Sequence, residues 1–137
     1  MALAHQFIIR GSEEEITFST EQEYVFVPDY LMQYLSDSMQ WIRTSWNDQI
    51  ELEGFPEEGF AIITELEVEH ILMIIQPFRA LFKASPETFS LTVRENSRAS
   101  YREVNVTRKE IVEEVEGWIR ICNLALQKHC RLLYKGL

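Results

Sequence analysis

The side chains best suited to chemistry in this chain are three histidines, two cysteines and many carboxylates, and their spacing predicts no metal site. His5, His70 and His129 are too far apart in sequence to form the helical pair of an H-E-x-x-H zinc motif. Cys122 and His129 would lie about 10 Å apart along a helix, too far to share one ion. We therefore expect no bound metal and no cofactor.

The two cysteines, Cys122 and Cys130, fall eight residues apart in a segment that is predicted to form one helix. A helical rise of about 1.5 Å per residue then separates them by about 12 Å. A disulfide needs Cα atoms within about 7 Å of each other, so the two cannot pair inside an intact helix. Reduced, buried thiols are expected.

Nucleophilic and acid–base catalysis find no support in the order of residues. The chain contains neither G-x-S-x-G nor a glycine-rich phosphate loop. Its carboxylates lie in polar runs such as 13–15, 57–58 and 113–116, which are typical of solvated faces. A catalytic triad is recognised by geometry rather than by sequence order, so one assembled across the fold stays open. An enzyme is the less favoured class.

Charge is divided unequally along the chain, whose net charge is −9. Residues 1–70 carry fifteen acidic residues and two basic ones, whereas residues 71–137 carry seven acidic and eleven basic residues. The excess of carboxylates argues against nucleic acid as a partner, because phosphate binding needs accumulated Lys and Arg. The division indicates either an interaction surface for a basic partner or two halves that neutralise each other on folding.

Two neighbouring segments form the candidate binding surface. Aromatic side chains on a predicted helix are followed by a loop rich in carboxylates, and rings beside clustered charge suit the capture of a basic protein. The alternative for the aromatic residues is burial of both flanks of the helix. The candidate partner-binding residues are Tyr30, Tyr34, Trp41, Asp48, Glu51, Glu53, Glu57 and Glu58.

The first half of the chain must position these residues. Alternating or apolar runs at 5–10, 16–19 and 24–27 predict three short strands, with Pro28 ending the third. Leu31, Leu35 and Met39 begin an apolar stripe with helical spacing, which predicts a helix over 30–46 with Asp29 as its cap. A solvated loop with a short strand at 50–52 follows, and 60–63 is either a strand or the approach to the next helix.

The second half predicts two helices around a hairpin. Residues 66–82 are apolar on most faces, which indicates a buried middle helix that Pro77 should bend. Strict alternation at 89–94 and 101–106 predicts an antiparallel hairpin. Thr107 and Glu110 form a capping box that starts a helix running from 108 to about 133.

These elements predict a single α+β domain over residues 1–137, with a small antiparallel sheet and about three helices on one face. The longest apolar run, 71–75, is far shorter than the 18 or more residues of a membrane span. The start of the chain lacks the pattern of a secretory signal. We therefore expect no membrane segment and a cytoplasmic location.

The function that fits these observations best is non-enzymatic binding of a protein with a basic surface. Its most concrete form is an immunity-type inhibitor that plugs the positively charged site of a nuclease-like toxin. A homo-oligomeric domain, with a homodimer as its simplest form, is the first alternative. A small-ligand-binding protein or enzyme with a pocket near Pro77 is the second.

Overall fold

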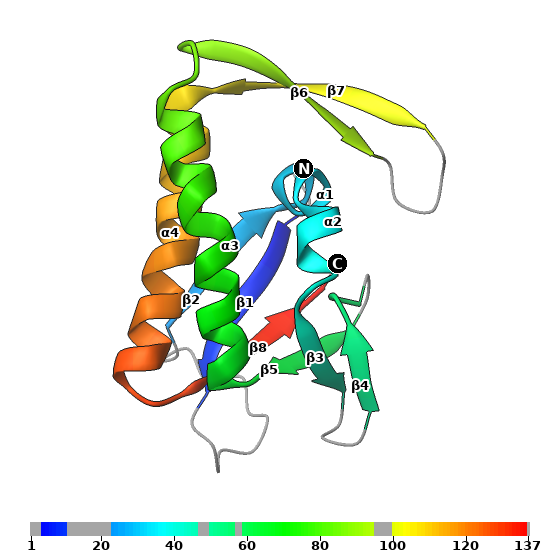
Figure 1. Cartoon of the computed structure of the whole chain (residues 1–137), viewed down its shortest axis with the longest axis vertical. Helices are drawn as coiled ribbons and strands as arrows, with labels where there is room; N and C mark the ends of the chain where they lie inside the picture. The colour runs from blue at the N-terminus through cyan, green and yellow to red at the C-terminus, as the bar shows by residue number, and fades with distance from the viewer. Residues whose placement is uncertain (1–3, 11–22, 47–49, 57–58, 95–99, 137) are drawn as a thin grey trace.

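A computed structural model describes residues 4–10, 23–46, 50–56, 59–94 and 100–136, and its fold is α+β, as predicted. Two long helices, α3 (Glu65–Lys83) and α4 (Arg108–Gln127), lie side by side on one face of a six-stranded antiparallel sheet, and a separate hairpin extends across one end (Figure 1). None of the helices in the described ranges is long and apolar enough to cross a bilayer.

The six strands of the main sheet are more numerous than expected. In chain order they are β1 (Ala4–Arg10), β2 (Tyr24–Pro28), β3 (Arg43–Trp46), β4 (Ile50–Glu53), β5 (Phe60–Ile63) and β8 (Arg131–Lys135). Their order across the sheet is β2-β1-β8-β5-β3-β4, and every neighbouring pair is antiparallel. The candidate strand at 16–19 lies outside the described residues. The strands predicted at 5–10, 24–27 and 50–52 are confirmed, and 60–63 is a strand.

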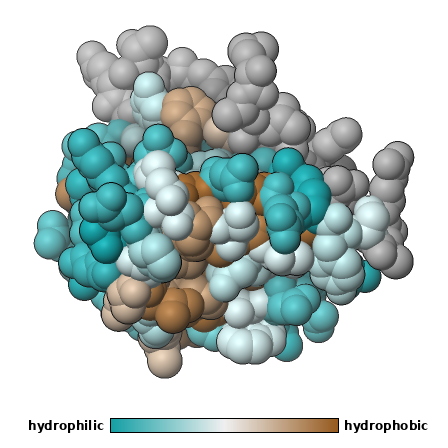
Figure 2. Space-filling model, turned by 90° about the horizontal axis from the view of Figure 1, so that it is seen from above, coloured by the Kyte–Doolittle hydropathy of each residue, from teal (hydrophilic) through white to brown (hydrophobic). Residues whose placement is uncertain are grey.

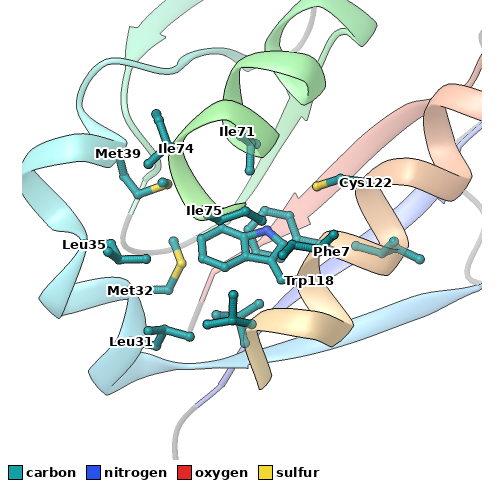
Figure 3. Packing of buried hydrophobic residues seen from close by; sticks show 14 of the residues in the cluster. Phe7, Leu31, Met32, Leu35, Met39, Ile71, Ile74, Ile75, Trp118 and Cys122 are labelled. Atoms are coloured by element: carbon teal, nitrogen blue, oxygen red, sulfur yellow. The ribbon is translucent and has the colours of Figure 1, made fainter. Parts of the chain in front are cut away.

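The core lies between the sheet and the helices, and Trp118 of α4 (Arg108–Gln127) is at its centre. Its side chain is fully buried, and its ring centroid lies 5.2 Å from that of Phe7 in β1. Figure 3 shows Trp118 between Phe7, Ile75 of α3 and Met32 of α1 (Asp29–Tyr34). A buried tryptophan provides a large apolar area, so this residue joins the sheet to helices α3 and α1.

The predicted hairpin and the predicted helix cap at Thr107 are confirmed. Strands β6 (Thr88–Arg94) and β7 (Tyr101–Thr107) pair in register from Thr88↔Thr107 to Arg94↔Tyr101. They form a second sheet of their own rather than joining the first. At the end of β7, Thr107 Oγ1 accepts a hydrogen bond from the backbone N–H of Glu110 at 3.1 Å and so caps α4.

The helix predicted over 30–46 is wrong in its second half. The segment forms α1, then the single-turn α2 (Ser36–Met39), and then strand β3. Leu31, Leu35, Met39 and Ile42 of the stripe are buried. Thr44, however, donates its hydroxyl to the carbonyl of Gly54 at 2.7 Å, and β3 pairs with both β4 and β5. Tertiary pairing therefore outweighs the helical spacing that Ile42 and Trp46 continue.

The helix predicted to continue to about residue 133 ends at Gln127. His129 adopts a left-handed backbone conformation with φ 53°, and β8 then enters the middle of the sheet. Leu132 and Leu133 face opposite sides of this strand and are both buried. A strand buried on both faces has no alternation of polar and apolar residues, so its sequence cannot be distinguished from the end of an apolar helix.

The prediction of a middle helix buried on most faces needs correction. Helix α3 (Glu65–Lys83) packs against α4 and the core along one face, whereas three large apolar side chains on it are more than half exposed, namely Leu66, Met73 and Leu81. The helix continues through Pro77, which lies on the exposed side. The bend at Pro77 stays a prediction.

Candidate functional site

The outer end of the main sheet carries exposed negative charge. Strand β4 is the terminal strand of the described sheet (Figure 1). Glu51 and Glu53 alternate along it and share one face, opposite Ser45 and Arg43 of β3. Both glutamates are exposed, and Arg43 makes only a 3.6 Å ion pair with Glu51 between two well-exposed side chains. Such a pair is worth little in water. Two glutamates against one arginine leave this face with a net negative charge.

Trp41 lies near the end of β4 along the backbone. It precedes β3, and the backbone N–H of Gly54, just after β4, donates to the carbonyl of Ile42 at 2.7 Å. The indole is 64% exposed. We call Trp41, Glu51 and Glu53 together the acidic edge. Of the eight residues predicted to bind a partner, these three are exposed and belong to adjoining segments of the backbone.

Tyr30 and Tyr34 have roles inside the fold. The Tyr30 hydroxyl donates a hydrogen bond to the Glu114 carboxylate of α4. The Tyr34 ring packs edge-to-face against Phe78 of α3, with centroids 6.1 Å apart. Both tyrosines are partly buried against the core. This agrees with the alternative given for the aromatic residues, namely that both flanks of the helix are buried. Asp48, Glu57 and Glu58 lie outside the described residues.

Burial shapes the titration of the Tyr30–Glu114 pair. It raises the pKa of the Glu114 carboxyl, and the neighbouring carboxylates of Glu110 and Glu113 raise it further, while the hydrogen bond from Tyr30 lowers it. The pKa of Tyr30 is raised by burial first and by Glu114 second. Tyr30 therefore keeps its proton at neutral pH and remains the donor.

The two unequally charged halves of the chain neutralise each other in part. Lys128 lies 3.9 Å from Glu23, and His129 lies 3.7 Å from Glu65. Within the described ranges, neither Glu53 nor Glu69 makes an ion pair. Cross-pairing thus reaches some front-half carboxylates and leaves Glu53 of the acidic edge unpaired.

A cavity of about 370 Å³ opens beside α1 and α2, and the sequence did not predict a cavity at this place. Its walls come from α1, α2, β1, β8 and the link after β4, and Arg94 at the end of β6 contributes to its rim. We call it the His5 cavity. The pocket predicted near Pro77 is a different place, because no residue of α3 lines the His5 cavity.

A chain of buried hydrogen bonds forms the back of the His5 cavity. His5 is 5% exposed; its Nε2 lies 2.7 Å from Asp29 Oδ1 and its Nδ1 lies 2.5 Å from the Tyr134 hydroxyl. A carboxylate only accepts, so Nε2 carries a proton; in the neutral ring, Nδ1 then accepts from Tyr134. This tautomer satisfies both ring nitrogens and ties β1, α1 and β8 together.

Asp29 also departs from its predicted role as a helix cap. Pro28 occupies the N-cap position, and the second carboxylate oxygen of Asp29 accepts from Gln33 Nε2 at 2.8 Å. Residues 5, 29 and 134 are too far apart in sequence for a motif to join them. No sequence signal identified this cluster; the one available hint was a histidine at an inward position of an apolar strand.

The described residues contain no group of three or more His, Cys, Asp and Glu side chains that could hold a metal ion. Both cysteines are free thiols. Cys122 is buried beside the core, and burial raises the pKa of its thiol to about 12. Cys130 is partly exposed and follows α4 rather than lying within it.

Known proteins supply no family for these features: no protein-family model matches the chain, and neither a curated protein nor a solved structure matches it.

Proposed function

We propose that this chain is a non-enzymatic domain that binds a basic protein through its acidic edge. The observation that carries the proposal is the exposure of Trp41 beside Glu51 and Glu53 on the outer strand of the sheet. Exposed carboxylates attract a cationic surface and raise the rate of encounter. An adjacent indole provides the apolar contact area that binding energy needs.

A purely protective role of the carboxylates explains less of this surface. Charged side chains on an outer strand keep it from pairing with other sheets. That role accounts for Glu51 and Glu53, but it does not account for a large aromatic side chain left 64% exposed next to them. Binding explains all three residues together.

The most concrete form of the proposal is an immunity-type inhibitor of a nuclease-like toxin in the cytoplasm. The catalytic cleft of a nuclease is positively charged because it holds phosphates. A compact domain with a carboxylate-rich edge could occupy such a cleft by charge complementarity. The negative charge that favours this partner disfavours nucleic acid itself.

The test begins with capture of partners by the intact chain, followed by purification of each captured protein and measurement of its affinity. The proposal expects a protein with a basic surface whose binding is lost in the triple variant Trp41→Ala/Glu51→Gln/Glu53→Gln. The matched control is Glu69→Gln/Glu103→Gln, which removes two exposed carboxylates elsewhere. Equal loss of binding in both variants, or a partner without a basic surface, would refute the acidic edge as the binding site.

A homo-oligomer is the second candidate, and the β6–β7 hairpin favours it. The hairpin pairs with no other strand of the described sheets, and Tyr101 on β7 is 68% exposed. Seen from the end that carries the hairpin, hydrophobic residues gather near the middle of the face and hydrophilic residues border them (Figure 2). Light scattering at two salt concentrations tests this candidate, and a monomer under both conditions would remove it.

A further inference from the structure

The lining of the His5 cavity includes both apolar side chains and hydrogen-bond acceptors. Met32, Met39 and Phe55 are the apolar lining residues. Asp29 and Gln33, which we call the acceptor wall, also line it, as do Ser36 and Asp37 of α2. The volume of about 370 Å³ falls at the lower end of the range for small-molecule sites. A ligand of a few heavy atoms, or one long side chain, matches this size.

The acceptor wall has capacity that the protein does not use. Asp29 accepts one hydrogen bond on each oxygen, from His5 and from Gln33, whereas a carboxylate offers about four lone-pair positions. The Gln33 amide must turn its NH₂ toward Asp29, which fixes the direction of its oxygen. That oxygen, Gln33 Oε1, is buried and has no hydrogen-bond partner.

The donors at the back of the cavity are already engaged. The Tyr134 hydroxyl and His5 Nδ1 are hydrogen-bonded to each other, and His5 Nε2 donates to Asp29. A bound anion would therefore be repelled by the carboxylates of Asp29 and Asp37. The basic residue in the lining is Arg94, which is exposed. A metal ion would find both ring nitrogens of His5 occupied. A ligand that brings its own N–H donors and positive charge meets neither obstacle.

We propose that the His5 cavity binds an organic cation with N–H donors, such as a primary ammonium group on a short apolar stem. The cation donates to Asp29 and, after a rotation of the Gln33 side chain that brings its buried oxygen to the cavity, to Gln33 Oε1; the stem packs against Met32, Met39 and Phe55. Charge-assisted hydrogen bonds are about twice as strong as neutral ones, so the positive charge dominates recognition. The inference does not depend on the proposed protein partner.

The methionines of this chain provide the measurement. Met32 and Met39 line the cavity, while Met73 is 73% exposed on α3 and serves as an internal control. We expect n-pentylammonium to shift the methyl NMR signals of Met32 and Met39 and to leave that of Met73 unchanged. Absence of any shift up to about 20 mM ligand, or an equal shift of Met73, would overturn the proposal.

Three analogues separate charge, donors and shape. 1-Pentanol has the same stem without charge, and it should bind at least about tenfold more weakly than n-pentylammonium. Pentyltrimethylammonium keeps the charge but has no N–H donor, and it should lose binding to a similar extent. N-Pentylguanidinium has both charge and donors and should bind. Equal binding of the neutral or the trimethylated analogue would contradict the proposed hydrogen bonds to Asp29 and Gln33.

Two variants locate the site. Asp29→Asn keeps the shape and removes the charge, and it should weaken n-pentylammonium binding at least about tenfold. Gln33→Met removes the unpartnered acceptor on a partly buried residue, and about a threefold to tenfold loss is expected. Gln33→Met keeps the test decisive if Asp29→Asn does not fold. Glu69→Gln is the control, and unchanged affinity in Gln33→Met would refute the assignment.

The cation could be a free amine or the lysine side chain of another protein. A blocked tripeptide with a central lysine, compared with n-pentylammonium, distinguishes these sources by which of the two binds more tightly. Either order supports the cation site, because both ligands carry the same group. Failure of both ligands to shift Met32 and Met39 would refute it.

Discussion

The acidic edge and the His5 cavity are built in opposite ways. Residues of the acidic edge lie within thirteen positions of one another, are exposed, and make at most one weak ion pair among their neighbours. The cavity network joins His5, Asp29 and Tyr134 across nearly the whole chain, is buried, and satisfies both nitrogens of the imidazole. The first arrangement leaves side chains available to a partner, whereas the second holds three elements of the fold together.

This difference separates stability from binding. Substitutions on the acidic edge should change affinity and leave the free energy of unfolding nearly unchanged, because exposed side chains contribute little to folding. Substitutions in the His5 network should lower the free energy of unfolding and leave the affinity for the basic protein unchanged, because a buried polar group that loses its partner keeps its desolvation cost.

The largest expected effect is that of Asp29→Ala on stability. The variant leaves the N–H of His5 and the amide of Gln33 without their acceptor and should lower the free energy of unfolding by about 2–3 kcal/mol. Urea denaturation measures it. Asp37→Ala, an exposed carboxylate on the neighbouring helix α2, is the control and should cost about 0.5 kcal/mol or less. Equal losses in the two variants would remove the contrast between the regions.

Trp41→Ala should have the largest effect on binding. Loss of an exposed indole at the centre of a contact costs about 2 kcal/mol, a factor of about 30 in the dissociation constant for the captured basic protein. Its free energy of unfolding should change by less than about 0.5 kcal/mol. Tyr101→Ala, a similarly exposed aromatic residue on the hairpin, should not affect binding. Calorimetry measures the affinity. Equal losses of affinity in Trp41→Ala and Tyr101→Ala would show that Trp41 is not part of the binding site.

Tyr30 tests whether an aromatic residue predicted at the binding surface belongs to the interior. Tyr30→Phe removes the donor to the half-buried Glu114 carboxylate and should destabilise the protein by about 1 kcal/mol without weakening partner binding. Tyr24→Phe, on an exposed ring, is the control for stability and should be nearly neutral. A loss of affinity for the basic partner in Tyr30→Phe would show that Tyr30 belongs to the binding surface after all.

The smallest predicted effect is a pH dependence from Glu114. Burial raises the pKa of this carboxyl above its usual value of 4.5, so the folded state favours the protonated form. Its contribution to stability is present below pH 4.5 and is lost as the pH rises through the folded pKa. The free energy of unfolding of Glu114→Gln relative to the original chain should therefore increase from pH 4.5 to pH 7. Urea denaturation at both pH values measures it, and a difference that does not change with pH would contradict the raised pKa.

Local patterns predicted those elements whose signals are short and regular. The alternation of β6 and β7 and the capping box at Thr107 contain all the information that their structures need. Residues 43–46 became a strand by pairing with 50–53 and with β5, and residues 131–135 by pairing with the distant strands β1 and β5, so helical spacing misassigned both. A strand in the middle of a sheet and a buried helix end have the same apolar composition, and pairing alone distinguishes them.

The two candidate sites differ in the same respect: one depends on residues close in sequence and the other on contacts between distant segments. Trp41, Glu51 and Glu53 were predictable because the residues that form the acidic edge are close in sequence. The His5 cavity could not be predicted in this way. Its back is formed by hydrogen bonds of His5 to Asp29 and Tyr134, and these contacts depend on the order of strands in the sheet. Strand order is set by long-range packing, which a single sequence does not display.

The most direct test of the account is the salt dependence of association between this chain and its captured basic partner. Stopped-flow measurements should show an association rate that falls at least about tenfold from low to high salt, because electrostatic attraction steers the encounter. In Glu51→Gln/Glu53→Gln this dependence should become markedly flatter, while Glu69→Gln/Glu103→Gln should retain it. An unchanged dependence in Glu51→Gln/Glu53→Gln would contradict the claim that the acidic edge meets the partner.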